Sequence, residues 1–291
     1  MKRFQGIFFG ILAASAFGMI PLFAVPVLRS GMNTSSVLFY RMFFSILLLG
    51  LLLLIKRADM RITRRQLLVT IGLSVLYTAS SLYLLESYLY IPSGIATTIH
   101  FLYPVFVTIM MVGVFKEKLS LAMALSIVLG VGGVYLLSTG SGDGQISFTG
   151  VWMVLITVVA YGGYLVGVNN TSANRVNSLV LTFYVLFFTT IFCGINLLFS
   201  EKGLEMIPDS SVAANLLMLG FIPTLVSNLF LILAIHRIGS TVTAVLGCME
   251  PLTAVGMGVL FLGEKLEGMQ YVGIIVVVVA VALVILGRKK G

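Results

Sequence analysis

Charged residues and cysteines are scarce in this sequence. Charged side chains make up 10% of the 291 residues, whereas a soluble domain carries roughly 25%. Hydrophobic residues reach 59% and the mean hydropathy is +1.12, so the chain lacks the polar surface that a fold in water needs. These values exclude a disordered chain, a nucleic-acid-binding protein and a secreted disulfide scaffold, and they predict an integral membrane protein.

The two cysteines, Cys193 and Cys248, both lie within apolar runs. Two such residues support neither a disulfide framework nor a metal cluster. We therefore expect two small core residues, no metal site and no cofactor.

Long apolar runs dominate the chain, and a helix needs about 20 mostly apolar residues to cross the hydrocarbon core. Cutting the sequence at charged and turn residues leaves ten runs: Phe4 to Val27, Ser36 to Ile55, Leu67 to Tyr88, Gly94 to Phe115, Ser120 to Ser138, Phe148 to Val168, Ser178 to Phe199, Val212 to Ile235, Thr241 to Leu262 and Met269 to Leu286. The first run continues well past a small-residue site at Ala16, so we do not interpret it as a cleaved signal peptide. The pattern predicts an all-α membrane protein with ten transmembrane helices.

Lysine and arginine are distributed unequally between alternate loops. With the N-terminus inside, the cytoplasmic side holds Lys2, Arg3, Lys56, Arg57, Arg61, Arg64, Arg65, Lys116, Lys118, Arg175, Arg237, Arg288, Lys289 and Lys290, and the other side holds Arg29, Lys202 and Lys265. Short cytoplasmic loops collect positive charge, so both termini are predicted to face the cytoplasm. The cluster at 56–65 can also bind anionic lipid, although a topology signal is the simpler interpretation.

The two halves of the sequence are related by a shift of 147 residues. This shift pairs Pro104 with Pro251 and Glu117 with Glu264, together with several apolar and serine positions around them. The pattern predicts two five-helix units, over residues 1–139 and 148–291. Because five is odd, the second unit enters the membrane from the opposite side, which is the inverted repeat of many secondary transporters.

The stretches 90–96, 102–104 and 116–119, with their counterparts 238–241, 249–252 and 262–266, resemble the paired EamA repeats of the drug/metabolite transporter superfamily. The resemblance implies a ten-helix carrier, often an exporter of amino acids or other small metabolites, with relatives that move nucleotide sugars or sugar phosphates. It also implies that the fifth and tenth helices stand at the periphery. The first run lacks the acidic residue found in the related four-helix multidrug carriers, so their coupling mechanism does not carry over.

Glu250 is the main candidate for a binding or coupling group. It lies about ten residues into the ninth run and therefore near the bilayer midplane. A carboxylate at that depth can bind a substrate ammonium or carry a coupling proton, although a protonated glutamate bonded within the bundle is the alternative. The repeat places Tyr103 opposite Glu250, and each precedes a proline, Pro104 or Pro251, that is expected to kink its helix.

Two further groups of intramembrane polar residues are candidates. Tyr161, Tyr164 and Asn228 can present hydroxyl or amide groups to a substrate. Arg41, Glu86 and His100 are all expected in the outer part of the bundle, where an ion pair between the first two can form an outer gate. The alternatives are a static pair, an arginine that extends to the headgroups, and a histidine that only packs.

An intramembrane enzyme is the main alternative outside transport. A paired-aspartate protease is excluded because Asp59, Asp143 and Asp209 all lie in predicted loops, and residues 90–94 do not supply the Gly-x-Ser-Gly segment of a rhomboid-like protease. A receptor or scaffold would not explain an inverted repeat. We therefore predict a carrier and no enzymatic activity.

Export of amino acids or related amphipathic metabolites by alternating access is the preferred function, because Glu250 favours a cationic or zwitterionic ligand. An exchanger of sugar phosphates or nucleotide sugars is the second choice. Such a protein should have two or more cationic side chains near the midplane, and the apolar runs show none there. Protons are the candidate coupling ion, and a monomer and a homodimer both stay open. The absence of a removable presequence or long tails fits a plasma or inner membrane.

Overall fold

The computed structural model describes residues 2–87, 90–91, 96, 99–138, 147–200, 202–261 and 268–286. Every regular element in these ranges is helical. The helices are α1 (Lys2–Phe17), α2 (Ile20–Arg29), α3 (Thr34–Ile55), α4 (Arg64–Ser87), α6 (Tyr103–Gly113), α7 (Leu121–Ser138), α8 (Phe148–Asn170), the 3₁₀ turn η1 (Ser172–Arg175), α9 (Ser178–Leu198), α10 (Ser210–Gly220), the π-helix η2 (Phe221–Val226), α11 (Ser227–Leu246), α12 (Met249–Phe261) and α13 (Gly268–Leu286).

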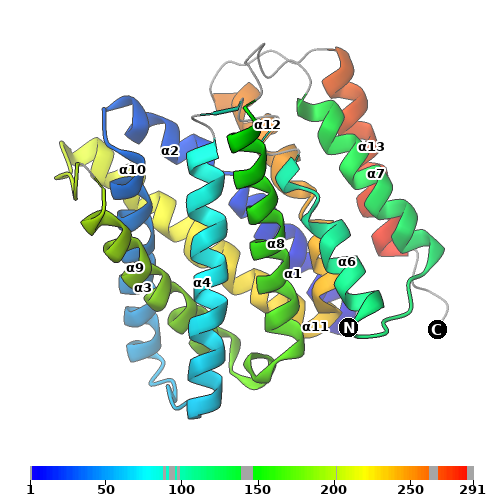
Figure 1. Ribbon diagram of the computed structural model, residues 1–291, viewed down its shortest axis with the longest axis horizontal. Coiled ribbons are helices and arrows are strands. Elements are labelled where there is room, and N and C mark those ends of the chain that lie inside the picture. The colour runs from blue at the N-terminus through cyan, green and yellow to red at the C-terminus, as the bar shows by residue number, and fades with distance from the viewer. Residues whose placement is uncertain are drawn as a thin grey trace.

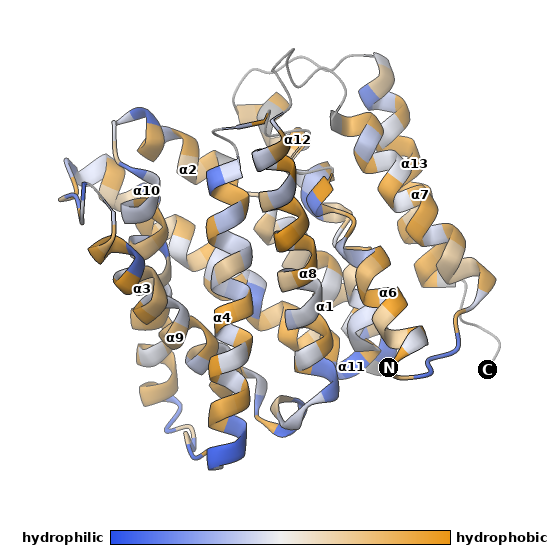
Figure 2. Cartoon of the chain, viewed as in Figure 1, coloured by the Kyte–Doolittle hydropathy of each residue, from blue (hydrophilic) through white to orange (hydrophobic). Residues whose placement is uncertain are grey.

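Seven helical stretches in the described part of the chain are long and apolar enough to cross a membrane. They are Arg3–Arg29, Thr34–Ile55, Arg64–Ser87, Phe148–Asn170, Ser178–Leu198, Ser210–Leu246 and Gly268–Ile285. Shorter apolar helices occupy Tyr103–Gly113, Leu121–Leu137 and Met249–Phe261. Most hydrophilic segments lie at the two ends of the bundle, and apolar and neutral residues cover its middle (Figure 2). The fold is therefore that of an all-helical, multi-pass membrane protein.

The helix partnerships occur in mirrored pairs. α1 packs on α11 as α8 packs on α4, α6 packs on α8 as α12 packs on α1, and α4 packs on α9 as α10 packs on α3. Two further pairs, α3 with α9 and α7 with α13, join equivalent helices of the two halves, and α7 and α13 run side by side along one edge of the bundle (Figure 1). The 147-residue repeat is thus present in the packing as well as in the sequence.

Both ends of the described chain meet at one end of the bundle. α1 begins and α13 ends at the same side in Figure 1. There the Arg3 guanidinium donates a hydrogen bond of 3.4 Å to the carbonyl of Val284. The two termini therefore lie on the same side of any membrane that the bundle spans.

Several spans are interrupted, and glycine or proline marks each interruption. α1 and α2 are separated by a turn at Gly18, and α11 contains Gly239 at φ 81° and ψ 168°, a conformation that is essentially restricted to glycine. Pro223 lacks the N–H that would bond the carbonyl of Leu219, and the Thr224 hydroxyl donates to that carbonyl instead at 2.8 Å. This exchange accompanies the single π-helical turn at η2.

The expected kinks at Pro104 and Pro251 take a different form. α6 begins at Tyr103 after a turn at 101–102, and α12 begins at Met249 after a turn at 247–248, so each proline lies in the first turn of a new helix. The N–H groups of a first turn have no acceptor within the helix, and proline therefore fits there without loss. The repeat contains two equivalent helix breaks, where the sequence predicts two bent helices.

Many hydroxyls in the bundle bond back to their own helix. In α4, Thr70 donates to the carbonyl of Gln66 at 2.8 Å, Ser74 to Thr70 at 2.8 Å, and Thr78 to Ser74 at 2.7 Å. Thr108, Ser126, Thr182, Thr190, Thr243 and Thr253 do the same in other helices. These buried hydroxyls are thus satisfied within their own helices.

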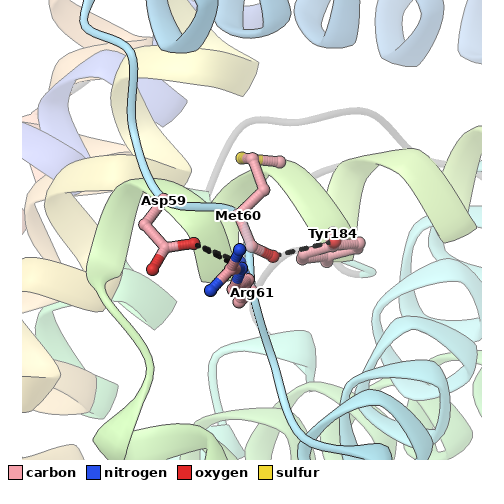
Figure 3. A network of polar contacts seen from close by, with 4 residues as sticks. All are labelled: Asp59, Met60, Arg61 and Tyr184. Carbon is pink, nitrogen blue, oxygen red and sulfur yellow. Dashed lines mark hydrogen bonds and ion pairs between the residues drawn. The ribbon is translucent and has the colours of Figure 1, made fainter.

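The loop between α3 and α4 carries the basic cluster of residues 56–65. Tyr184 of α9 donates a hydrogen bond of 3.1 Å to the carbonyl of Met60, and Arg61 lies 4.0 Å from Asp59 (Figure 3). The Arg61 and Asp59 side chains are exposed, so this ion pair contributes little to stability. The loop is held against the bundle by this tyrosine contact and by the packing of Ala58, Met60 and Ile62 on the core.

Candidate functional site

A small cavity of about 10 Å³, roughly the space of one water molecule, lies between helices of both halves. Its wall is formed by α1, α6, α8, α11 and α12. The lining residues are Gly10, Ala13, Ala14, Phe17, Tyr103, Tyr161, Leu165, Ser227, Leu231, Thr243, Gly247 and Glu250. The wall is therefore mainly apolar, with a few hydroxyls and one carboxylate, and the space is too small for a metabolite until the surrounding helices move apart.

Glu250 lies in the first turn of α12, directly after the break at 247–248. An acidic side chain in a first turn interacts favourably with the helix dipole. Gly18, in the turn between α1 and α2, packs against the backbone carbonyl of Glu250, where a side chain would find no room. Within the described part of the chain, no group donates a hydrogen bond to the Glu250 carboxylate. The backbone of Glu250 is therefore held in place by packing, and its carboxylate can accept a hydrogen bond from a group in the cavity.

An aromatic column connects the cavity wall to the interior. His100 and Tyr103 have ring centroids 5.4 Å apart, Tyr103 and Tyr161 are 4.8 Å apart, Tyr161 and Tyr164 are 6.2 Å apart, and Tyr164 and Tyr77 are 5.3 Å apart. The Tyr103 hydroxyl lies against Gly247, one turn before Glu250. The predicted juxtaposition of Tyr103 and Glu250 is present in this geometry, and Tyr161 joins them.

Tyr164 and Asn228 lie behind the wall of the cavity. The amide nitrogen of Asn228 donates to the Tyr77 hydroxyl and to the Thr224 carbonyl, both at 2.8 Å. The Asn228 Oδ1 and the Tyr164 hydroxyl are buried with no partner among the residues described. The Asn228 Oδ1 can accept a hydrogen bond and the Tyr164 hydroxyl can donate or accept one.

Arg41 is buried at the interior end of this polar region. Its Nε donates to the Thr224 hydroxyl at 2.6 Å and its Nη2 donates to the Pro223 carbonyl at 3.4 Å. Its Cζ lies 5.3 Å from the centroid of the Phe17 ring. The charges of Arg41 and Glu250 attract each other, although the two groups form no ion pair. The anchor depends on η2, because Pro223 frees the carbonyl that takes the Thr224 proton.

The expected outer gate of Arg41, Glu86 and His100 is not assembled. Glu86 is exposed near the end of α4, whereas Arg41 points to η2. His100 is buried, and its Nδ1 lies 2.8 Å from the hydroxyl of Thr157. The sequence gives the depth of each residue along its helix and not the direction of its side chain, which is why three residues of similar expected depth lie apart.

Sequence reasoning missed several wall residues. Phe17, Ser227 and Thr243 line the cavity, and Ser227 also bonds the carbonyl of Ala13 at 2.9 Å, which joins α11 to α1. Phe17 is an apolar residue in an apolar run, and nothing in the pattern separates it from its neighbours. Ser227 is marked in the sequence only by its place next to Asn228. Thr243 is marked only by its place in the segment that leads to Glu250.

Among the described residues no group of three or more histidine, cysteine or acidic side chains can hold a metal ion. Cys193 and Cys248 are free and buried. Glu264, the repeat partner of Glu117, lies outside the described residues. The candidate site is thus an apolar cavity with Glu250 in its wall. The aromatic column and Arg41 lie next to it.

No curated protein matches this sequence significantly. A solved structure described only as the crystal structure of a protein superposes with a TM-score of 0.83 at 16% identity, covering 99% of this chain and 100% of its own. At that identity the likeness shows the fold alone. The sequence matches the EamA-like transporter family over residues 4–139 and 148–286, nearly its whole length in two copies. The chain belongs to the EamA-like transporter family, and it is a membrane transporter of the drug/metabolite transporter superfamily.

Proposed function

We propose that the protein is a secondary-active carrier that exports amino acids or related amphipathic metabolites by alternating access. The proposal includes ten transmembrane helices in two inverted units, with both termini in the cytoplasm of a cell with a plasma or inner membrane. The mirrored packing of the helices supports it, because two equivalent sets of contacts can exchange roles when the cavity changes sides.

The observation that carries the substrate class is the Glu250 carboxylate in an apolar, aromatic cavity. An ammonium group can pair with this carboxylate, while an apolar side chain of the ligand packs on Tyr103, Tyr161 and Leu165. The same carboxylate can take up a proton when the substrate leaves, which gives a route for proton coupling. Both roles require a carboxylate that is not already engaged in an ion pair or a hydrogen bond with the protein.

An exchanger of sugar phosphates fits this cavity less well. A dianionic phosphate is held by two or more cations, usually arginine or lysine. Among the described residues, no arginine or lysine is part of the cavity wall, and Arg41 lies behind it against Phe17. Glu250 would repel an anionic ligand. The carboxylate therefore favours a cationic or zwitterionic substrate.

The test is transport into liposomes that contain the purified protein, with a panel of amino acids and a proton gradient of either direction. We expect gradient-dependent movement of at least one apolar amino acid, and a loss of about 100-fold or more of the coupled rate in Glu250→Gln, since removal of an essential proton-transfer or charge-pairing group typically has effects of this order. The matched control is Asp59→Asn, which removes one carboxylate from an exposed loop and should transport as wild type.

Two results would contradict the proposal. If the wild-type protein moves no amino acid on the panel under either gradient, the substrate class is wrong. If Glu250→Gln keeps both rate and gradient dependence, Glu250 is structural and the binding group lies elsewhere in the cavity.

A further inference from the structure

Arg41 is an unusual residue for its position. It is 8% exposed, and only one salt bridge is present in the described part of the chain, between Arg61 and Asp59. A buried cation is costly unless it is paired. The contacts to Thr224 and Pro223 are with neutral oxygens, so they orient the guanidinium without neutralising it.

The guanidinium has donors to spare. It carries five N–H groups in a planar fork, and the hydrogen bonds to Thr224 and Pro223 use Nε and Nη2. No hydrogen bond of Nη1 to a described residue is present. Because the Thr224 proton goes to the carbonyl of Leu219, the hydroxyl can only accept from Arg41, which holds the fork in one orientation.

Phe17 covers this arginine on the side of the cavity. The Phe17 ring is part of the cavity wall, Arg41 is not, and the Arg41 Cζ lies 5.3 Å from the ring centroid. A cation over an aromatic face is stabilised, which compensates partly for the missing counter-ion. The ring therefore separates a preoriented cation from the space that contains Glu250.

Phe17 also lies at a break between two helices. It is the last residue of α1, and the turn at Gly18 separates α1 from α2. Gly18 in turn packs on the carbonyl of Glu250 and on Thr253 of α12. The break that carries the Phe17 ring is therefore in direct contact with the helix that carries Glu250.

We propose that Arg41, covered by Phe17, is an occluded subsite for one carboxylate group of the transported molecule, and that it opens when the Phe17 ring moves aside. The planar fork matches the two oxygens of a carboxylate. One guanidinium neutralises one negative charge, and the nearby Glu250 disfavours a second. The inference deepens the proposed function, since it assigns the anionic end of the substrate to a group separate from Glu250.

The first experiment measures binding without transport. The purified protein is heated with sodium isovalerate or with isovaleramide, which have the same shape but differ in charge. We expect isovalerate alone to raise the unfolding temperature of the wild type, Arg41→Met to lose that rise, and Arg41→Lys to need about ten-fold more isovalerate because the fork is lost. Phe17→Ala should need about three- to ten-fold less, since the ring no longer has to be displaced before binding.

The matched controls are Arg237→Met and Phe9→Ala. Arg237 lies 4.7 Å from the ring of Phe9, the same kind of contact on an exposed arginine. Both variants should respond to isovalerate as the wild type does. If the wild type shows no rise, or if the isovalerate response persists in Arg41→Met, the subsite is wrong. If Arg41→Met does not fold, an unchanged isovalerate requirement in Phe17→Ala overturns the proposal by itself.

The second experiment compares leucine with leucine amide in liposomes, in mildly acidic buffer where both carry an ammonium group. The wild type should prefer leucine by about ten-fold or more, the scale of one charge-assisted bidentate contact, and Arg41→Met should lose the preference. A preference retained in Arg41→Met overturns the subsite while the carrier function stands. If the wild type moves neither compound but still shows the Arg41-dependent isovalerate response, the proposed function is wrong and the subsite stands.

Discussion

At the scale of single residues, Gly239 shows how one backbone conformation defines the course of two helical segments. Its φ of 81° and ψ of 168° turn the chain between the segment that ends at Ile238 and the segment that begins at Ser240. Nothing lies within 4 Å of the position of a side chain there. The requirement for glycine is therefore conformational and not a matter of space.

We predict that Gly239→Ala lowers the free energy of unfolding by about 1–3 kcal/mol, the cost of holding a non-glycine residue in this region. Thermal or denaturant-induced unfolding in detergent micelles measures the change. Gly72→Ala is the matched control, since Gly72 is helical and also has open space around it; it should be neutral or stabilising by about 0.5–1 kcal/mol. Equal effects of the two substitutions would show that the turn at Gly239 is not required.

The contact partner of Arg41 could not be predicted from the sequence. Counting residues placed it within the second apolar run, with Glu86 as the expected partner, and Glu86 is exposed. Its partner is Thr224, whose hydroxyl is available only because Pro223 leaves the Leu219 carbonyl free. That exchange depends on a local π-helix, and no periodicity in the sequence marks one.

At the scale of elements, α7 and α13 approach each other closely through glycine. A side chain on Gly273 would lie 2.8 Å from the backbone nitrogen of Leu137 and 2.9 Å from the carbonyl oxygen of Gly133. Backbone atoms cannot move aside as a flexible side chain can. Small residues allow such contacts in membranes, where close packing between helices replaces the hydrophobic effect.

We predict that Gly273→Ala separates the two helices and lowers the free energy of unfolding by about 1–3 kcal/mol, as overpacking usually does. Gly132→Ala, on α7 with nothing within 4 Å, should have little effect. Unfolding in micelles gives the stabilities, and cross-linking of cysteine pairs along α7 and α13 measures their separation. Retained cross-linking and stability in Gly273→Ala would refute the close contact.

Helix breaks were harder to predict than helices. The apolar runs located the helical segments, because span length is set by the bilayer and appears directly in composition. They did not show that α1 ends at Phe17, or that Pro104 and Pro251 start new helices. Proline indicates a disturbance in either case, and only tertiary packing decides whether the helix bends or restarts.

At the scale of the whole molecule, the repeat determines which surfaces are equivalent. The cavity takes α1 and α6 from one half, and α8, α11 and α12 from the other. The mirrored partnerships of α1 with α11 and of α8 with α4 each supply at least one helix to its wall. Their equivalence was predicted from paired residues 147 apart, because a repeat leaves a sequence pattern even when individual side chains have diverged.

The proposed orientation makes a direct prediction about access from each side of the membrane. In a Cys193→Ala, Cys248→Ala background, a membrane-impermeant maleimide added to intact cells should label Lys202→Cys and leave Arg61→Cys unlabelled. Both positions are exposed and in loops, so the difference reports the side and not burial. Labelling of Arg61→Cys alone would reverse the orientation.

The hydroxyls that bond back to their own helices also affect how the molecule moves. When α4 slides over α8 and α9, the bonds of Thr70, Ser74 and Thr78 travel with the helix and none has to break. At these three positions, sliding of the helices exchanges van der Waals contacts and breaks no hydrogen bond. Resistance to reorientation is then concentrated in the few bonds that cross between helices, such as Arg41 to Thr224 and Asn228 to Tyr77.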